Sequence, residues 1–182
     1  MKTRMLTLLS AVVVLHLLPV HVHAAGRGPS LPNASEPASR EDQSALWKTL
    51  EQLSFAAVEG ADSVTRTVAR HQVPLPGAGA SGLAIGAGLQ GTNVDVQLDP
   101  AGTLETVSFD LRGGCISTRT LLSQYPGLLV LHVPLHPQAN PVLGTTIAGA
   151  LVRFRMATES GPCVIGVAVQ TVEMAKAQHW LN

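Results

Sequence analysis

The sequence predicts an α+β protein with a mainly antiparallel sheet of about five strands, packed against a long N-terminal helix and a short second helix. Two hydrophobic periods support this class. Apolar residues recur at helical spacing between residues 40 and 59, whereas from Thr92 onward they alternate with polar residues as in strands. Tight turns join several of these strands, and such turns connect antiparallel neighbours.

The first 24 residues have the parts of a cleavable secretory signal: a positive start at Lys2 and Arg4, an apolar run, and small residues before the cut. We expect cleavage after Ala24, with Ala25 as the close alternative. A retained anchor needs about 20 apolar residues, and this run is shorter. The sequence therefore predicts an exported protein, in the periplasm or outside the cell, with no stable membrane span after signal removal.

The charge balance argues against nucleic acid as a partner. The chain has 12 Lys and Arg against 12 Asp and Glu, and loss of Lys2 and Arg4 with the signal leaves ten against twelve. No basic stripe interrupts this balance, so the electrostatic footprint of a nucleic-acid-binding protein is missing from the sequence. Arg outnumbers Lys and Ala and Gly are abundant, which is typical of a GC-rich bacterial proteome.

A disordered leader is predicted for residues 25–38, because the segment is rich in Pro and Gly and has no periodicity. One α+β domain follows over residues 39–182. Its first element is a helix over residues 40–59, capped by Ser39 and ended by Gly60. A shorter helix over residues 62–71 follows. The long helix carries an apolar stripe made of Leu46, Leu50, Leu53 and Ala57.

Residues 73–91 form a Gly/Pro-rich segment, predicted as a mobile linker or a Gly-rich strand. Residues 77–82 satisfy the pattern GxGxxG. A dinucleotide site needs a strand before this pattern and a helix after it. Here prolines precede it and further glycines follow, so no cofactor is predicted.

The strand-rich half begins with a hairpin of residues 94–98 and 104–111 around a turn at residues 99–102. A short helix starts at Ser117 or Thr118 and ends at Tyr125. The later elements follow from apolar runs: a strand at 128–133 covered on both faces, a loop at 134–141, a strand at 146–156, a turn at 159–162, a strand at 163–172, and a helical turn at 173–179.

Cys115 and Cys163 are the two cysteines of the chain. An even count in an exported protein favours a disulfide, here one that joins the helix starting at Ser117 or Thr118 to the last strand. The alternatives are a nucleophilic thiol or a metal ligand. Neither cysteine lies in a CxxC pair, and an oxidising compartment would consume a free thiol.

No catalytic residue or metal ligand is predicted. His132 and His136 have the spacing of a helical metal site, but Pro134 lies between them and no acidic residue is near. Asp95 and Asp110 share the polar side of the predicted hairpin. Paired carboxylates can act as acid and base, although a solvated polar face is the simpler interpretation.

Arg153 and Arg155 alternate with apolar residues, and Arg112 ends the preceding hairpin, so the three form a candidate partner surface on the outer face of the sheet. Arg is enriched at protein interfaces. The competing interpretation is an ordinary strand face whose arginines pair with Asp95 or Asp110 across strands.

These features predict an exported, non-catalytic small binding module that acts on a protein partner in the bacterial envelope or outside the cell, of the inhibitor, immunity or assembly-factor type. This expectation rests on the class of protein and not on a recognised site. The alternatives are a structural or stress-response envelope protein and a small envelope hydrolase.

Overall fold

A computed structural model describes residues 36–75, 81–136, 139–157 and 163–181. The predicted signal, its cleavage site, most of the leader, the turn at 159–162 and most of the GxGxxG pattern lie outside these ranges. Within them the chain is α+β with an antiparallel sheet, as predicted. No helix among these residues is long and apolar enough to cross a membrane.

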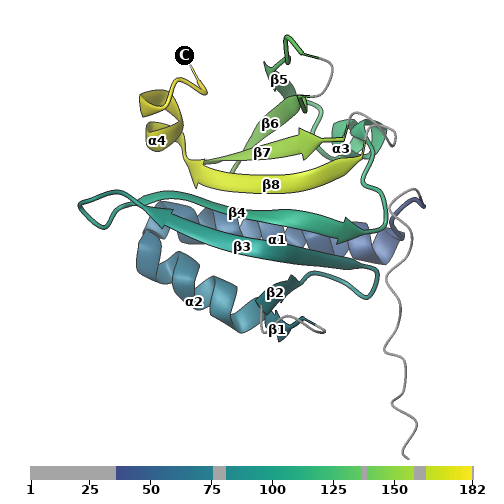
Figure 1. Cartoon of the computed structure of the whole chain (residues 1–182), viewed down its shortest axis with the longest axis horizontal. Helices are drawn as coiled ribbons and strands as arrows, with labels where there is room; N and C mark the ends of the chain where they lie inside the picture. The colour runs from purple at the N-terminus through teal and green to yellow at the C-terminus, as the bar shows by residue number, and fades with distance from the viewer. Residues whose placement is uncertain (1–35, 76–80, 137–138, 158–162, 182) are drawn as a thin grey trace, which may run out of the picture. The chain divides into compact units, whose positions relative to one another are not determined.

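The described residues form one sheet of eight strands in the order β1-β2-β3-β4-β8-β7-β6-β5, with every neighbouring pair antiparallel. Figure 1 shows β1 and β5 at the two ends of this order. The strands are β1 Gln72–Pro74, β2 Ser81–Ala84, β3 Leu89–Leu98, β4 Leu104–Gly113, β5 Leu129–His132, β6 Val142–Ile147, β7 Ala150–Met156 and β8 Val164–Thr171.

Four helices accompany these strands in the described ranges: α1 Arg40–Glu59, α2 Ala61–His71, α3 Thr118–Gln124 and α4 Val172–Ala177. The bounds of α1 are those predicted, and its predicted cap is confirmed, because the Ser39 hydroxyl accepts the N–H of Asp42. Ser117 caps α3 in the same way through the N–H of Thr120. These side chains satisfy backbone donors that the first helical turn leaves free.

The main core lies between α1, α2 and one face of the sheet. The predicted stripe of α1 is buried, and α1 contacts β4, β6, β7 and β8, while α2 contacts β2 and β3. In Figure 1, α1 runs behind β3 and β4. Alternate residues of the strands face the helices, and these are Val107, Phe109 and Leu111 on β4, Val152, Phe154 and Met156 on β7, and Val167 and Val169 on β8. The other residues of each strand form the opposite face, called the open face below.

The predicted number of strands is wrong. The expected strand 146–156 is two strands, β6 and β7, joined at Ala148 and Gly149, which both have positive φ. A two-residue hairpin turn of this kind matches the twist of its strands. The usual signal for such a turn is Asn-Gly or Asp-Gly, so Ala-Gly gives no turn signal and the sequence pattern predicts one long strand.

The strand predicted at 128–133 exists as β5, but it is not covered on both faces. β5 ends the sheet, and Leu129, Val130 and Val133 are 54%, 63% and 70% exposed. A continuous apolar run is typical of a strand buried on both faces. Here the order of the strands puts that run at an edge, which periodicity does not reveal.

The described part of the Gly/Pro-rich segment contains strands as well as loops. β2 and two of the three residues of β1 lie in it, and β3 begins at Leu89. A side chain at Gly91 would press on Leu83 and Phe109, so this strand position is close-packed. The expectation of a Gly-rich strand thus holds for residues 81–84 and 89–91.

Candidate interaction surface on the open face

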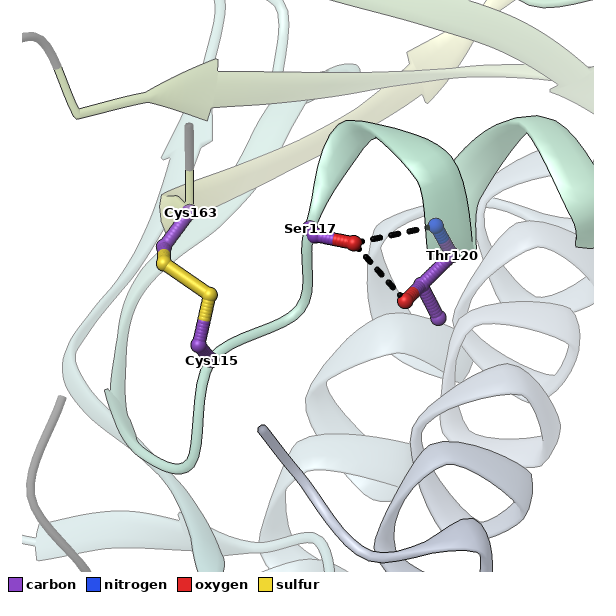
Figure 2. Close-up of a disulfide and its surroundings, with 4 residues drawn as sticks. All are labelled: Cys115, Ser117, Thr120 and Cys163. Atoms are coloured by element: carbon purple, nitrogen blue, oxygen red, sulfur yellow. Dashed lines mark hydrogen bonds between the residues drawn. A yellow bond between two sulfur atoms is a disulfide. The ribbon is translucent and has the colours of Figure 1, made fainter. Parts of the chain in front are cut away.

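The predicted disulfide between Cys115 and Cys163 is present, and it fixes one end of the sheet. Figure 2 shows Cys115 on the loop that leads into the Ser117 cap of α3 and Cys163 at the start of β8. Backbone hydrogen bonds hold the same place, because the N–H of Val164 donates to Ile116 and the N–H of Ala38 donates to Cys115. The disulfide therefore ties α3, β8 and the segment before α1 together.

Two rows of paired residues cross the open face. One row runs from Asp110 on β4 over Gly166 on β8 to Arg155 on β7. The second runs from Asp95 on β3 over Ser108 and Ala168 to Arg153, and then over Gly144 to Leu129 on β5. The centre of both rows consists of small side chains, so longer side chains on the flanking strands enclose a shallow space.

The first row is closed by an ion pair. Arg155 donates to the Asp110 carboxylate at 2.5 Å across β8, and Asn93 donates to the other carboxylate oxygen at 2.7 Å. Gly166 makes this pairing possible, since a Cβ there would lie 3.0 Å from the Arg155 guanidinium. Arg155 therefore forms a cross-strand ion pair with Asp110, as the competing interpretation of the sequence expects.

Arg153 has a different environment. Its guanidinium lies 4.1 Å from the centre of the Trp180 ring, which is a cation–π contact. Its Nε is buried without a hydrogen-bond partner in the described structure. The Arg155–Asp110 pair is the one ion pair found among the described residues, so no carboxylate there neutralises Arg153. Burial lowers the pKa of Arg153, because desolvation disfavours its charged form.

A hollow of about 330 Å³ lies over the centre of these rows. Its lining includes the side chains of Asn93, Gln97, Ser108, Asp110, Arg153 and Arg155. A second hollow, of about 250 Å³, lies next to the disulfide and is lined by Arg112 and Arg155 among others. Arg155 borders both hollows, so the three arginines of the candidate partner surface lie on one face of the sheet.

The C-terminal segment covers one end of the open face. α4 contacts β7 and β8, and the paired residues Leu151 and Gln170 are fully buried on this side of the sheet. The Gln170 side chain reaches Gln178 at 3.4 Å. Trp180 then lies over Arg153. The C-terminal segment therefore contacts Arg153, one of the residues that line the hollow.

The exposed edge of β5 adjoins this face. β5 pairs with β6 on one side, and the described residues supply no strand on the other side. Leu131 lies over Gly144, and Leu129 continues the row of Arg153. Leu135, just beyond the strand, is 95% exposed. An apolar edge thus continues from the arginine-bearing part of the open face.

The other candidate residues are not brought into a reactive arrangement. Asp95 accepts a hydrogen bond from Gln97 at 2.7 Å, and it does not line either hollow. Asp110 is the carboxylate in both hollows, and both of its oxygens already accept hydrogen bonds. His132 and His136 are exposed. Within the described ranges, no three residues among His, Cys, Asp and Glu lie close enough to hold a metal ion.

Sequence reasoning missed two features of this surface. Trp180 lies next to a predicted helical turn, and no local pattern connects it to Arg153, which is 27 residues earlier in the chain. A tryptophan is costly to leave in a tail unless it packs, and this was an available signal. The β5 edge was missed because the run of apolar residues favoured a buried strand.

The comparisons with known proteins add no relative. No protein-family model matches this chain, and neither curated proteins nor solved structures gave a significant match.

Proposed function

We propose that the protein is an exported, non-catalytic module that binds a protein partner in the bacterial envelope or outside the cell, and that it does so by strand addition at β5. The observation that carries this proposal is the unprotected apolar edge of β5 beside the arginine-bearing open face. An edge strand presents free N–H and C=O groups that pair readily with another chain. Extended peptides bind many protein modules in this way.

The two ends of the sheet differ in a way that favours β5. β1 has three residues and contains Pro74, which has no N–H and blunts an edge. β5 belongs to the run Leu128–Val133, which contains no Asp, Glu, Lys or Arg. Natural edges are normally protected by charge, proline or a covering element. The lack of such protection at β5 supports a partner at that edge.

The edge also indicates the chemistry of the partner. Leu129 and Val130 are more than half exposed, and an added strand would place its own side chains beside them. Leu129 and Val130 are neighbours in the strand and point to opposite faces of the sheet, so an extended segment with apolar residues on both of its faces would bury this surface. Arg153 lies two strands inward from β5 and has no acidic partner among the described residues, so an acidic group elsewhere on the same binding partner would meet its charge.

Export is supported by the disulfide, because such bonds persist in oxidising compartments. It has a direct test in the N-terminus of the protein recovered from an envelope or culture fraction. Mass spectrometry is expected to show a chain that begins at Ala25. An intact Met1 on protein recovered from the cytosol would contradict export.

The binding proposal is tested by capture from an envelope fraction with the mature, disulfide-linked chain as bait. Val130→Lys puts a charge in the strand and should abolish capture of a specific partner. Val58→Lys makes the same substitution at a 54% exposed site on α1, away from β5, and serves as the matched control. Equal capture by the two variants would exclude strand addition at β5.

A further inference from the structure

The hollow on the open face has the composition of a small ligand site. Its floor is made of small residues, Ser108, Gly166 and Ala168, and its sides carry amides and guanidinium groups. A volume of about 330 Å³ is at the lower end of the range for small-molecule sites. Such a space admits a molecule of modest size that lies across the middle of the sheet.

The charges that line this hollow do not cancel. Arg155 and Asp110 neutralise each other, and Asn93 occupies the second oxygen of Asp110. The charge of Arg153 is left over, with a buried Nε that has no hydrogen-bond partner in the described part of the chain. A partly desolvated cation without a counter-charge is unfavourable, and an anion in the hollow would supply that counter-charge to the guanidinium.

The Trp180 contact prepares Arg153 for this role. The centre of the indole ring lies 4.1 Å from the guanidinium carbon, and this cation–π contact holds the guanidinium in place without a hydrogen bond to its N–H groups. A planar guanidinium pairs with a carboxylate through two parallel hydrogen bonds. A carboxylate is therefore the anion that fits a guanidinium held in this way.

We propose that this hollow binds the carboxylate group of a small polar molecule, with Arg153 as the residue that contacts the carboxylate. The rest of the molecule lies over Ser108 and Ala168, where Asn93 and Gln97 can form hydrogen bonds with its polar groups. This site does not depend on strand addition at β5. β6 lies between β5 and the strand of Arg153, so either site can be removed without the other.

The test uses the position of Trp180. The chain has two tryptophans, and Trp47 is replaced by Phe to keep its edge contact with Tyr125. The fluorescence of Trp180 in the mature, disulfide-linked protein is then titrated with glutarate and, at matched ionic strength, with glutaramide. Glutaramide has nearly the same shape but no charge. We expect a saturable change with glutarate and none with glutaramide.

Arg153→Gln should weaken the response to glutarate about tenfold or more, because hydrogen bonds between charged groups contribute that much to affinity. Arg66→Gln is the matched control, since Arg66 is exposed on α2, across the sheet from the hollow. Ala168→Leu fills the hollow and leaves Arg153 in place, so it should remove binding even if Arg153→Gln perturbs the fold. Circular dichroism of each variant monitors folding.

A third titration, with a blocked peptide that contains one Glu, identifies the source of the carboxylate. Tighter binding of the peptide than of glutarate would assign the site to an acidic side chain of a protein, with the same role for Arg153. Equal responses to glutarate and glutaramide, or a glutarate response that survives both Arg153→Gln and Ala168→Leu, would overturn the proposal. Val130→Lys should leave the glutarate titration unchanged, which separates this site from the β5 edge.

Discussion

Removal of the disulfide should lower the stability of the protein by several kcal/mol. The perturbation is the double variant Cys115→Ala/Cys163→Ala. The two cysteines are 48 residues apart, and the chain-entropy relation for a closed loop of this size gives about 4 kcal/mol of stability from the constraint on the unfolded chain. Alanine is preferred to serine because Cys163 is buried, and a hydroxyl there would add a desolvation penalty of its own.

The native fold should survive this change. Backbone hydrogen bonds from Ala38 to Cys115 and from Val164 to Ile116 hold the same junction without the sulfur atoms. The double variant should therefore lose stability mainly because its unfolded chain has more conformational entropy. For a domain of this size, about 4 kcal/mol corresponds to a decrease in Tm of about 8 to 16 °C.

The assay is urea unfolding of the wild-type protein, the reduced wild-type protein and the double variant, followed by far-UV circular dichroism. The reduced protein and the double variant should unfold at similar urea concentrations, both well below the oxidised protein. The m-value of the oxidised protein should be smaller, since a cross-linked unfolded chain exposes less surface. An unfolding free energy for the double variant within about 1 kcal/mol of wild type would refute the entropic reasoning.

Three further predictions concern stability. Asp42→Ala should lower the free energy of unfolding by about 3 kcal/mol in urea titrations, because the buried carboxylate accepts hydrogen bonds from the N–H of Gly88 and the hydroxyl of Ser39. Asp42→Asn should lose less stability, and a loss below about 1 kcal/mol for Asp42→Ala would contradict this role. Tyr125 is the only tyrosine, and burial, together with the charge of Glu51, raises its pKa to about 12, so phenolate absorbance should appear near pH 12. Because the fold favours the neutral form, the stability that Tyr125 contributes is complete below pH 10 and is lost between pH 10 and 12. Phenolate absorbance with a midpoint near pH 10 in the folded protein would contradict this burial. Gly113→Ala and Gly102→Ala both place alanine at positive φ, but only at Gly113 does a Cβ collide with a carbonyl oxygen, that of Gly88. Thermal unfolding should show a loss of stability of about 1 kcal/mol for Gly102→Ala and about 3 kcal/mol for Gly113→Ala. Equal losses would show that the close approach at Gly113 has no energetic consequence.

Local patterns predicted the elements that depend on nearby residues. The bounds of α1 followed from the Ser39 cap, the stripe of leucines and Gly60. The hairpin of β3 and β4 followed from alternation around the turn at residues 99–102. In each case the interactions that define the element lie within a few residues, so the sequence alone contains the signal.

The order of the strands depends on distant residues, and it was not predictable from local patterns. β8 lies between β4 and β7, although β4 ends at Gly113 and β8 begins at Val164. This order places β5 at an edge. The same apolar run would be a covered core strand in the middle of the sheet, so periodicity had no means to separate the two.

The same dependence decides the difference between Arg153 and Arg155. The alternation of β7 places both on the open face, which the sequence predicts, but their surroundings come from β8 and from the end of the chain. Arg155 lies beside Gly166 and reaches Asp110 across it. Arg153 lies beside Ala168 and meets Trp180 instead of a carboxylate. Two arginines with the same local sequence pattern thus differ in their surroundings, because one is paired with a carboxylate and the other contacts an aromatic ring. It follows that the surroundings of the two arginines are set by one glycine and one tryptophan, and substitutions at these two positions should change them more than substitutions in the helices beneath the sheet.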